Sequence, residues 1–394
     1  MSRGAQELDQ KRVITVFERW GVRSVINGKG VYTDLGGAYI SPSVWALMTE
    51  ANLHSVDVVS LLEGTGRRIA QMLGCEAAWI VPGASAGIAL ATAACISCGD
   101  GRAIERLPDT TGLKPGVVIQ RGHRYKYLRM AWMTGARVVF AGDDGATTPA
   151  QLDAALDPET VSMFLFVGHL DGRNGTVPFA EAVRISGRKG IPIFVDAAFL
   201  NYPPASMRRF TDAGADLVCY SAKYCYGPNA GGFVAGRRAL VEKVARVDFT
   251  RFESGTVLRF GRPFKLDRFT VVGTMAALEE WFATDHEARW KSYARAVEVI
   301  GAALTGVTGV KARPRSFTME EALEDAPINC LELRVDPKLA GFTATELHRD
   351  LAEGDPRILV HLFDPETLVI AVDAMAPGAE HAVAARLREA CLRD

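Results

Sequence analysis

The sequence lacks any stretch of apolar residues long enough to cross a membrane. A transmembrane helix needs about 20 consecutive apolar residues, and every apolar run in this chain of 394 residues is shorter. The first eleven positions are polar and of mixed charge, and they do not resemble a secretory leader. We therefore expect a cytoplasmic protein with no membrane partner.

An excess of one charge is also missing. The chain has 45 Lys and Arg residues against 46 Asp and Glu residues, which gives a net charge of −1. Proteins that bind nucleic acids usually gather basic residues in a patch or stripe, and no such block occurs here. The sequence therefore predicts no nucleic-acid partner.

The seven cysteines are scattered and odd in number, which argues against a disulfide framework. Cys95 and Cys98 form a C-x-x-C pair, but no second Cys or His pair follows at zinc-finger spacing. The pair lies in an alanine-rich run typical of a buried helix, which favours small core residues over a redox or zinc site. We expect no metal.

Short apolar runs alternate with helical patterns through the middle of the chain. The expected strands are 77–81, 117–120, 137–140, 162–167, 192–195 and 216–220. The expected helices are 84–98, 125–134, 149–156, 178–189 and 207–213. This alternation predicts an α/β fold, a mostly parallel sheet with helices on both faces.

The character of the chain changes after Lys265. A long helical stretch, 267–304, broken near Asp285, precedes apolar runs at 330–335, 358–362 and 368–372, with helices near 344–353 and 380–391. Such a length suits more than one domain. We expect an N-terminal arm over 1–50, a large α/β domain over 51–265 and a small α+β domain over 266–394.

A turn of small residues follows the first of these strands, at the edge where open α/β sheets bind ligands. Positions 82–87 read Pro-Gly-Ala-Ser-Ala-Gly and open a helix, so backbone N–H groups there suit a phosphate. The turn alone is a weak signal, because Gly and Ala turns before helices are common. It contains neither the G-K-[ST] of a P-loop nor the G-x-G-x-x-G of a dinucleotide site.

A carboxylate and an amine follow two later strands. Asp196 ends an apolar run and can pair with a protonated pyridine nitrogen, although an ordinary Asp that caps a turn is the alternative. Lys223, beside Ser221, begins an aromatic, glycine-rich loop where a lysine can be desolvated and nucleophilic; the alternative is a surface lysine. In the order phosphate turn, Asp, Lys and small domain, these features match fold-type I enzymes that use pyridoxal 5'-phosphate (PLP).

Longer motifs carry the match further. They are Val25-Ile26-Asn27 with Thr33-Asp34-Leu35-Gly36-Gly37, Ala86-Gly87 with Ala89-Leu90-Ala91, Ile104-Glu105-Arg106-Leu107-Pro108-Asp109-Thr110, Gln120-Arg121-Gly122-His123-Arg124, Val195-Asp196-Ala197-Ala198 and Gly261-Arg262-Pro263-Phe264-Lys265. On these motifs the chain resembles the selenocysteine-synthase-like family of PLP enzymes, and within it the D-glucosaminate-6-phosphate ammonia-lyase branch.

The resemblance implies a role for each matching residue. Lys223 would carry PLP as a Schiff base and move protons, Asp196 would face the ring nitrogen, and His123 would stack on the ring. Gly83, Ala84, Ser85 and Ser221 would complete the cofactor site. Asn27 and Arg262 would contact substrate or cofactor. The alternative for His123 is an ordinary histidine at the end of a strand, and the alternative for Arg262 is an ion pair at a domain hinge. The resemblance also implies a homodimer or larger homo-oligomer with its active site at the subunit interface.

Three positions depart from the family pattern. Tyr226 stands where the family has an Arg that can pair with phosphate or carboxylate. Arg259 stands where the family has a small residue, and His361 stands where an Arg is expected. The substrate side of the site is therefore altered, and we expect that a sugar-acid phosphate is not the substrate.

The expected activity is a reaction on a small amino acid through a carbanion at Cα. Elimination by a lyase resembling an ammonia-lyase is the first hypothesis. A racemase, an aminotransferase or a β-replacement transferase shares every step up to the carbanion, so these alternatives stay open. A transferase that acts on aminoacyl-tRNA and a PLP-fold protein without catalysis are more remote.

Overall fold

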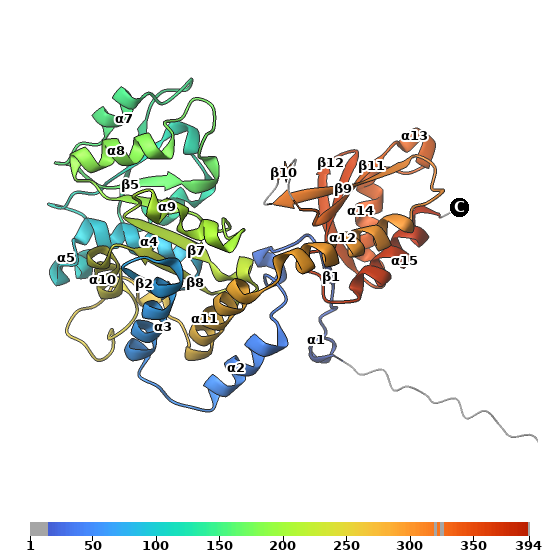
Figure 1. Cartoon of the computed structure of the whole chain (residues 1–394), viewed down its shortest axis with the longest axis horizontal. Helices are drawn as coiled ribbons and strands as arrows, with labels where there is room; N and C mark the ends of the chain where they lie inside the picture. The colour runs from blue at the N-terminus through green and yellow to red at the C-terminus, as the bar shows by residue number, and fades with distance from the viewer. Residues whose placement is uncertain (1–14, 319–320, 324–326, 393–394) are drawn as a thin grey trace, which may run out of the picture. The chain divides into compact units, whose positions relative to one another are not determined.

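The computed structural model describes residues 15–318, 321–323 and 327–392. The described chain forms two compact units (Figure 1). The large unit comprises residues 36–284, and the small unit comprises residues 15–35 and 285–392. Every helix in these ranges is too short or too polar to span a bilayer.

A seven-stranded sheet forms the centre of the large unit, in the strand order β2-β8-β7-β6-β5-β3-β4. Its strands are β2 (Ala77–Val81), β3 (Gly116–Gln120), β4 (Arg137–Ala141), β5 (Val161–Val167), β6 (Ile193–Asp196), β7 (Leu217–Ser221) and β8 (Gly232–Gly236). β8 runs antiparallel to β2 and β7, whereas the pairs from β7 to β4 are all parallel. The mostly parallel sheet expected from the alternating pattern is confirmed.

Helices pack around this sheet. They are α2 (Pro42–Asn52), α3 (Val58–Leu73), α4 (Gly83–Ser97), α5 (Gly101–Arg106), α6 (Arg129–Trp132), α7 (Pro149–Ala155), α8 (Phe179–Lys189), α9 (Arg209–Asp212), α10 (Arg238–Val247) and α11 (Arg268–Ala283). Local signals set several helix ends: the Asp57 carboxylate accepts the Ser60 N–H before α3 at 2.7 Å, and Gly190, with φ +65°, ends α8.

The buried helix α4 lies against β7 and β8. Gly87 permits the close approach, because a β-carbon there would stand 3.2 Å from both Cys219 Cβ and Val234 Cγ2. Cys95 is buried in this helix, as its alanine-rich surroundings predicted. The packing holds the N-terminus of α4 near the ends of the two strands that border it.

The small unit is built on a six-stranded sheet in the order β1-β12-β13-β11-β9-β10. Its strands are β1 (Ile26–Gly28), β9 (Val310–Thr318), β10 (Glu321–Leu323), β11 (Cys330–Val335), β12 (Ile358–Asp364) and β13 (Thr367–Ala371), and its helices are α1 (Val16–Arg19), α12 (His286–Ala302), α13 (Pro337–Ala340), α14 (Ala344–Glu353) and α15 (Ala379–Cys391). α12 and α14 pack against this sheet and α15 packs against both helices, around an apolar core that includes Leu333, Val360 and Ile370.

The units divide at other positions than those expected from the sequence. The expected boundary followed Lys265, but α11 packs against α2 and α3 and belongs to the large unit, so the division falls at Asp285, the N-cap of α12. The expected arm also divides, because β1 pairs with β12 of the small unit whereas α2 packs in the large one. β8 (Gly232–Gly236) was not among the expected strands, since its Gly-rich sequence has low strand propensity.

Candidate active site in the large unit

The carboxyl ends of β6 and β7 bring Asp196 and Lys223 into neighbouring segments. β6 ends at Asp196, which lies beside Cys219 in the parallel register of the two strands. The backbone continues the pairing beyond the strands, since Ser221 N donates to Ala198 O at 3.0 Å. Lys223 follows in a short 3-10 turn, η6 (Ala222–Cys225). The two residues singled out from the sequence therefore occupy one edge of the sheet.

Asp196 is buried and surrounded by neutral donors. The Tyr125 hydroxyl donates to its Oδ2 at 2.8 Å, and the Ala198 N–H donates to its Oδ1 at 3.1 Å. The Cys219 thiol lies 3.7 Å from the same Oδ1. No Lys or Arg in the described ranges forms an ion pair with this carboxylate. Burial consequently raises the pKa of Asp196, although the Tyr125 hydrogen bond opposes that rise.

The phosphate turn lies beside the lysine loop. α4 begins at Gly83, where φ is +82°, and its N-cap Pro82 offers no side-chain hydrogen bond to the first turn. A β-carbon at Gly232 would stand 2.6 Å from the Gly83 Cα, so these two backbones touch. The Gly231 carbonyl accepts the Ala222 N–H at 2.9 Å. The helix N-terminus, the start of β8 and the turn of Lys223 thus form one edge of the site.

Aromatic rings line the lysine loop. Lys223 is half-buried, and its Nζ lies 5.0 Å from the centre of the Tyr224 ring. Tyr226 adopts φ +58° at the end of the 3-10 turn, and its ring lies 5.8 Å from that of Trp281. The Trp281 indole in turn donates to the Asn201 carbonyl at 2.9 Å. Tyr226 therefore belongs to an aromatic wall beside the lysine loop.

His123 lies in the core behind the strand ends. Its side chain is 0% exposed, and its ring meets Phe166 edge-on at 4.7 Å between centres. The Val167 N–H donates to Nδ1 at 3.4 Å, and Nε2 has no partner at hydrogen-bond geometry within the described residues. Burial lowers the pKa of His123 to about 4, so the imidazole is neutral. The structure covers the ring and leaves no face of it open to solvent.

Arg259 and Arg262 each face an acidic residue. Arg259 Nη1 lies 3.4 Å from Asp248 Oδ1 and donates to the Ala245 carbonyl at 3.0 Å. Arg262 pairs with Glu253 at 2.7 Å, in a more exposed position. Both arginines of the expected substrate set are therefore held in ion pairs inside the large unit.

Asn27 and His361 lie together in the small unit, around one turn. The Asn27 amide donates to the Gly30 carbonyl at 2.9 Å, and its oxygen accepts the Lys29 N–H at 3.0 Å. The Lys29 carbonyl lies 2.9 Å from His361 Nε2. The His361 ring also lies 4.8 Å from the ring of Tyr32. The sequence singled out Asn27 and His361 separately, and the parallel pairing of β1 with β12 brings them together.

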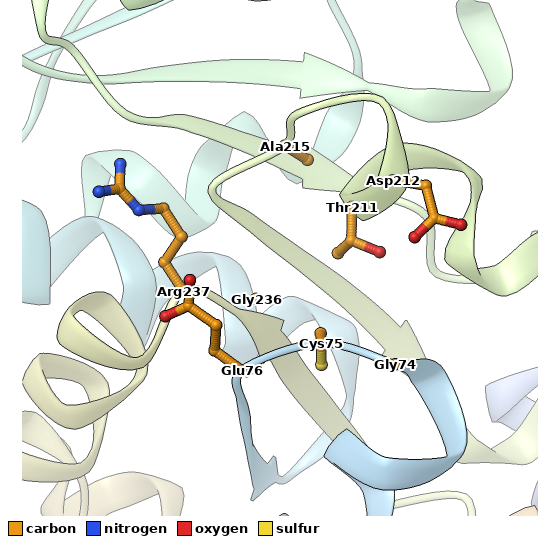
Figure 2. Close-up of a pocket in the computed structure, with 8 residues that line it drawn as sticks. All are labelled: Gly74, Cys75, Glu76, Thr211, Asp212, Ala215, Gly236 and Arg237. Carbon is orange, nitrogen blue, oxygen red and sulfur yellow. The ribbon is translucent and has the colours of Figure 1, made fainter.

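A hollow of about 390 Å³ lies at the opposite ends of the central strands from Lys223 (Figure 2). It is lined by Gly74, Cys75, Glu76, Thr211, Asp212, Ala215, Gly236 and Arg237. β7 begins and the antiparallel β8 ends beside it, whereas Lys223 follows the other end of β7. No residue expected from the sequence to serve catalysis lines this hollow.

Known proteins resemble the chain over nearly its whole length. No family model matches it. A 5'-C-glycyluridine monooxygenase-decarboxylase of Streptomyces sp is 30% identical over 387 residues, which cover 95% of this chain and 92% of that protein. The D-glucosaminate-6-phosphate ammonia lyase of Salmonella typhimurium is 26% identical, over 95% of this chain and 97% of the relative. The chain belongs to the selenocysteine-synthase-like family of fold-type I PLP enzymes.

Solved structures agree with this membership. The structure of a D-glucosaminate-6-phosphate ammonia-lyase matches with a TM-score of 0.83 and 25% identity, over 96% of this chain and 99% of that one. A serine palmitoyltransferase with PLP matches at a TM-score of 0.54 and 14% identity, and that likeness shows the fold alone. The predictions of a fold-type I enzyme and of PLP as its cofactor are confirmed.

The donor set of the large unit fits PLP. Asp196 is a buried carboxylate that accepts hydrogen bonds from the Tyr125 hydroxyl and the Ala198 N–H, and such a carboxylate suits a protonated ring nitrogen. The uncapped N-terminus of α4 offers backbone N–H groups for a phosphate. Lys223 follows both of them along the chain and supplies the amine. When bound, the cofactor supplies an electron sink for a carbanion at the substrate Cα.

Sequence reasoning missed Tyr125, although its hydroxyl contacts Asp196. The residue stands two positions after His123 in a segment that reads as the start of a helix, and a tyrosine there carries no signal of its own. Only the fold shows the contact, because the turns that follow β3 and β6 meet at the same edge of the sheet.

Proposed function

We propose that this PLP enzyme acts on an α-amino acid, with Lys223 as the base that removes and returns the proton at Cα. The observation that carries the proposal is the neighbouring placement of Lys223 and the buried Asp196 at the ends of paired strands. Lys223 is half-buried, and its Nζ lies 5.0 Å from the centre of the Tyr224 ring.

The remaining cofactor contacts follow from the same edge of the sheet. In this proposal Asp196 holds the ring nitrogen, and Gly83, Ala84 and Ser85 donate to the phosphate. Ser221 lines the site at the end of β7. For His123, which is covered in the structure, contact with the ring requires the turn after β3 to move.

Elimination of a group from the substrate is the reaction that we propose first, because the ammonia-lyase relatives cover 95–96% of the chain. The phosphate of those relatives' substrate is not expected here. Tyr226 packs against Trp281 where the family has a cation, and a phenol does not replace an arginine as a bidentate phosphate partner. The proposed substrate is an amino acid without a phosphate on this side.

Oxidative decarboxylation is the second candidate, favoured by the 30% identity with a monooxygenase-decarboxylase. In the balanced reaction, an α-amino acid and O2 give a carboxamide, CO2 and water. One oxygen atom enters the product, and the other accepts two protons and leaves as water. Oxidation of the substrate supplies all four electrons that reduce O2, so no added reductant is needed.

One experiment separates these reactions. Holoenzyme is incubated with a panel of amino acids, including nucleoside-linked ones, in deuterated water, while O2, CO2 and ammonia are measured. Deuterium at Cα of the recovered substrate, with release of ammonia and no O2 uptake, supports elimination, whereas equal uptake of O2 and release of CO2 supports oxidative decarboxylation. Racemised or transaminated product points to the other reactions, and activity on seryl-tRNA points to the transferase.

Lys223→Ala is the matched control for that experiment. It should abolish the absorption band of the bound cofactor and all exchange at Cα. If Lys223→Ala retains both, or if no amino acid changes the holoenzyme spectrum, the proposal is wrong. Arg262→Ala, Asn27→Ala and His361→Ala then report by an increase in KM whether these side chains meet the substrate.

We further propose a cytoplasmic homodimer or larger homo-oligomer whose subunits share the active site. α2 exposes the apolar side chains of Trp45, at 58% exposure, and of Leu47, and Leu53 at its C-cap is exposed as well. A second copy of the chain would remove these side chains from water. Light scattering of the wild type and of Trp45→Glu tests the assembly. Mixing Lys223→Ala with Arg262→Ala tests the shared site, since a KM restored to the wild-type value requires residues from both subunits.

A further inference from the structure

Tyr125 makes the shortest hydrogen bond to Asp196 among the described residues. Its hydroxyl lies 2.8 Å from Asp196 Oδ2, across 71 positions of sequence. The ring is itself held edge-on by Tyr127, at 5.7 Å between centres. A tyrosine that reaches a buried carboxylate in this way fixes the direction of that carboxylate.

The arrangement leaves room for one more donor on Asp196. An ionised carboxylate has about four lone-pair sites. The Tyr125 hydroxyl occupies one on Oδ2, and the Ala198 N–H and the Cys219 thiol face Oδ1. A further site remains on Oδ2, on the oxygen that Tyr125 holds. A protonated ring nitrogen is the donor that this site fits.

We propose that Tyr125 is a positioning residue that keeps Asp196 ionised and directs its free lone pair toward the ring nitrogen of the cofactor. The proposal rests on the role of Asp196 in the proposed function. It adds to that role a residue outside the motifs of the family, which acts only through the carboxylate.

The groups around Asp196 determine in which direction the loss of the Tyr125 hydroxyl shifts the pKa of Asp196. Burial raises the pKa of Asp196, and the hydrogen bond from Tyr125 is the strongest influence that lowers it. The Cys219 thiol on β7 and His169 after β5 lower that pKa further, and Lys223 follows β7 on the same edge. Without the phenol, Asp196 takes up a proton at a higher pH. Its pairing with the ring nitrogen is then lost at a higher pH as well.

Cofactor binding across pH tests this directly, without a measurement of activity. The dissociation constant of PLP is measured by absorption and fluorescence from pH 5 to pH 9 for the wild type, Tyr125→Phe and Tyr127→Phe. The acid limb is the pH range in which PLP binding weakens as the solution becomes more acidic. Tyr125→Phe should move the midpoint of this limb upward by about one to two pH units. Tyr127→Phe makes the same change two positions away and should leave the limb in place, because no hydrogen bond joins that hydroxyl to Asp196.

A stronger donor gives a test of the opposite sign. Site-specific replacement of Tyr125 by 3-fluorotyrosine makes the phenol a better donor, and the acid limb should move downward. This replacement keeps the ring and its packing, so it remains decisive if Tyr125→Phe unfolds. A limb that stays within 0.3 pH units of the wild type in both variants overturns the proposal.

Asp196→Asn separates a failure of this inference from a failure of the proposed function. The amide does not titrate, so this variant should bind PLP weakly and with no acid limb, and adding Tyr125→Phe should change nothing further. Wild-type binding in Asp196→Asn overturns the role of Asp196 itself. Weak binding in Asp196→Asn together with wild-type behaviour in Tyr125→Phe overturns the role of Tyr125 alone.

Discussion

Gly232, at the start of β8, lies directly against Gly83, at the start of α4. A β-carbon on Gly232 would stand 2.6 Å from the Gly83 Cα and 2.7 Å from the Tyr220 carbonyl oxygen. The phosphate turn and the loop that ends at β8 can therefore lie this close together only because Gly232 has no side chain, and Gly83 supplies the positive φ of +82° at the start of α4.

Gly232→Ala should destabilise the large unit and weaken cofactor binding together. Backbone atoms surround the added carbon, so no flexible side chain can move away, and overpacking of this kind costs roughly 1–3 kcal/mol. Denaturant unfolding and PLP titration check both effects. Gly187→Ala on α8 is the control, since nothing lies within 4 Å of its β-carbon. Equal stability of the two variants would contradict the prediction.

Arg259 and Arg262 should differ in their contribution to stability. Asp248 is almost fully buried, and it accepts hydrogen bonds from Trp79 Nε1 and from Thr250 as well as facing Arg259. Arg259→Ala leaves that buried carboxylate without its cation and should lower the free energy of unfolding by roughly 1–3 kcal/mol. Arg262→Ala breaks an exposed pair and should cost less than about 1 kcal/mol. Urea unfolding at pH 7 compares them, and the reverse order would refute the assignment.

His123 should make stability fall as the solution becomes acidic. Its pKa in the fold is about 4, below the ordinary value of 6.5, because burial disfavours the charged form. The unfolded chain therefore binds a proton that the fold excludes, and stability is lost as pH falls from 6.5 to about 4, by at most about 3 kcal/mol. His123→Phe should flatten the unfolding free energy over this window. A slope identical to that of the wild type would show that His123 does not cause it.

Asp373 should have the opposite dependence on pH. This residue follows β13, and burial raises its pKa to about 6 from an ordinary 3.8. Its Oδ2 lies 3.5 Å from the Asn329 amide, and its Oδ1 would stand 3.0 Å from a β-carbon on Gly30. The fold must hold a buried charge above pH 6, so Asp373→Asn should stabilise the protein at pH 8 and leave it unchanged at pH 4. Thermal melts at both values check this, and equal gains at both would contradict it.

The order of strands and helices was largely readable from local patterns. The run 77–81 is the strand β2 as observed, and the break near Asp285 coincides with the N-cap of α12. These features depend on apolar periodicity and on capping, which act over a few residues. β8 was not predicted because Gly-Gly-Phe-Val-Ala-Gly has low strand propensity. Its glycines instead allow close approach to Gly83 and to the Asp216 carbonyl.

The candidate site was predictable as a set of residue types and less so as a geometry. Asp196 and Lys223 follow apolar strands, and parallel strands end at the same edge of a sheet, so their proximity could be expected. The sequence could not predict that Phe166 covers His123 or that Arg259 pairs with Asp248, because each contact depends on side chains from other elements. Tyr125 was missed for the same reason.

The sequence by itself determined the fold class and the cofactor, and it singled out Lys223 as the lysine proposed to carry that cofactor. These follow from the order of a phosphate turn, an aspartate and a lysine along the chain, and each lies at the end of an apolar strand. Only the tertiary structure decided which groups set the charge of Asp196, because Tyr125, Ala198 and Cys219 reach it from three separate segments. The pKa of a buried carboxylate depends on distances and on desolvation, and these exist only once the chain has folded.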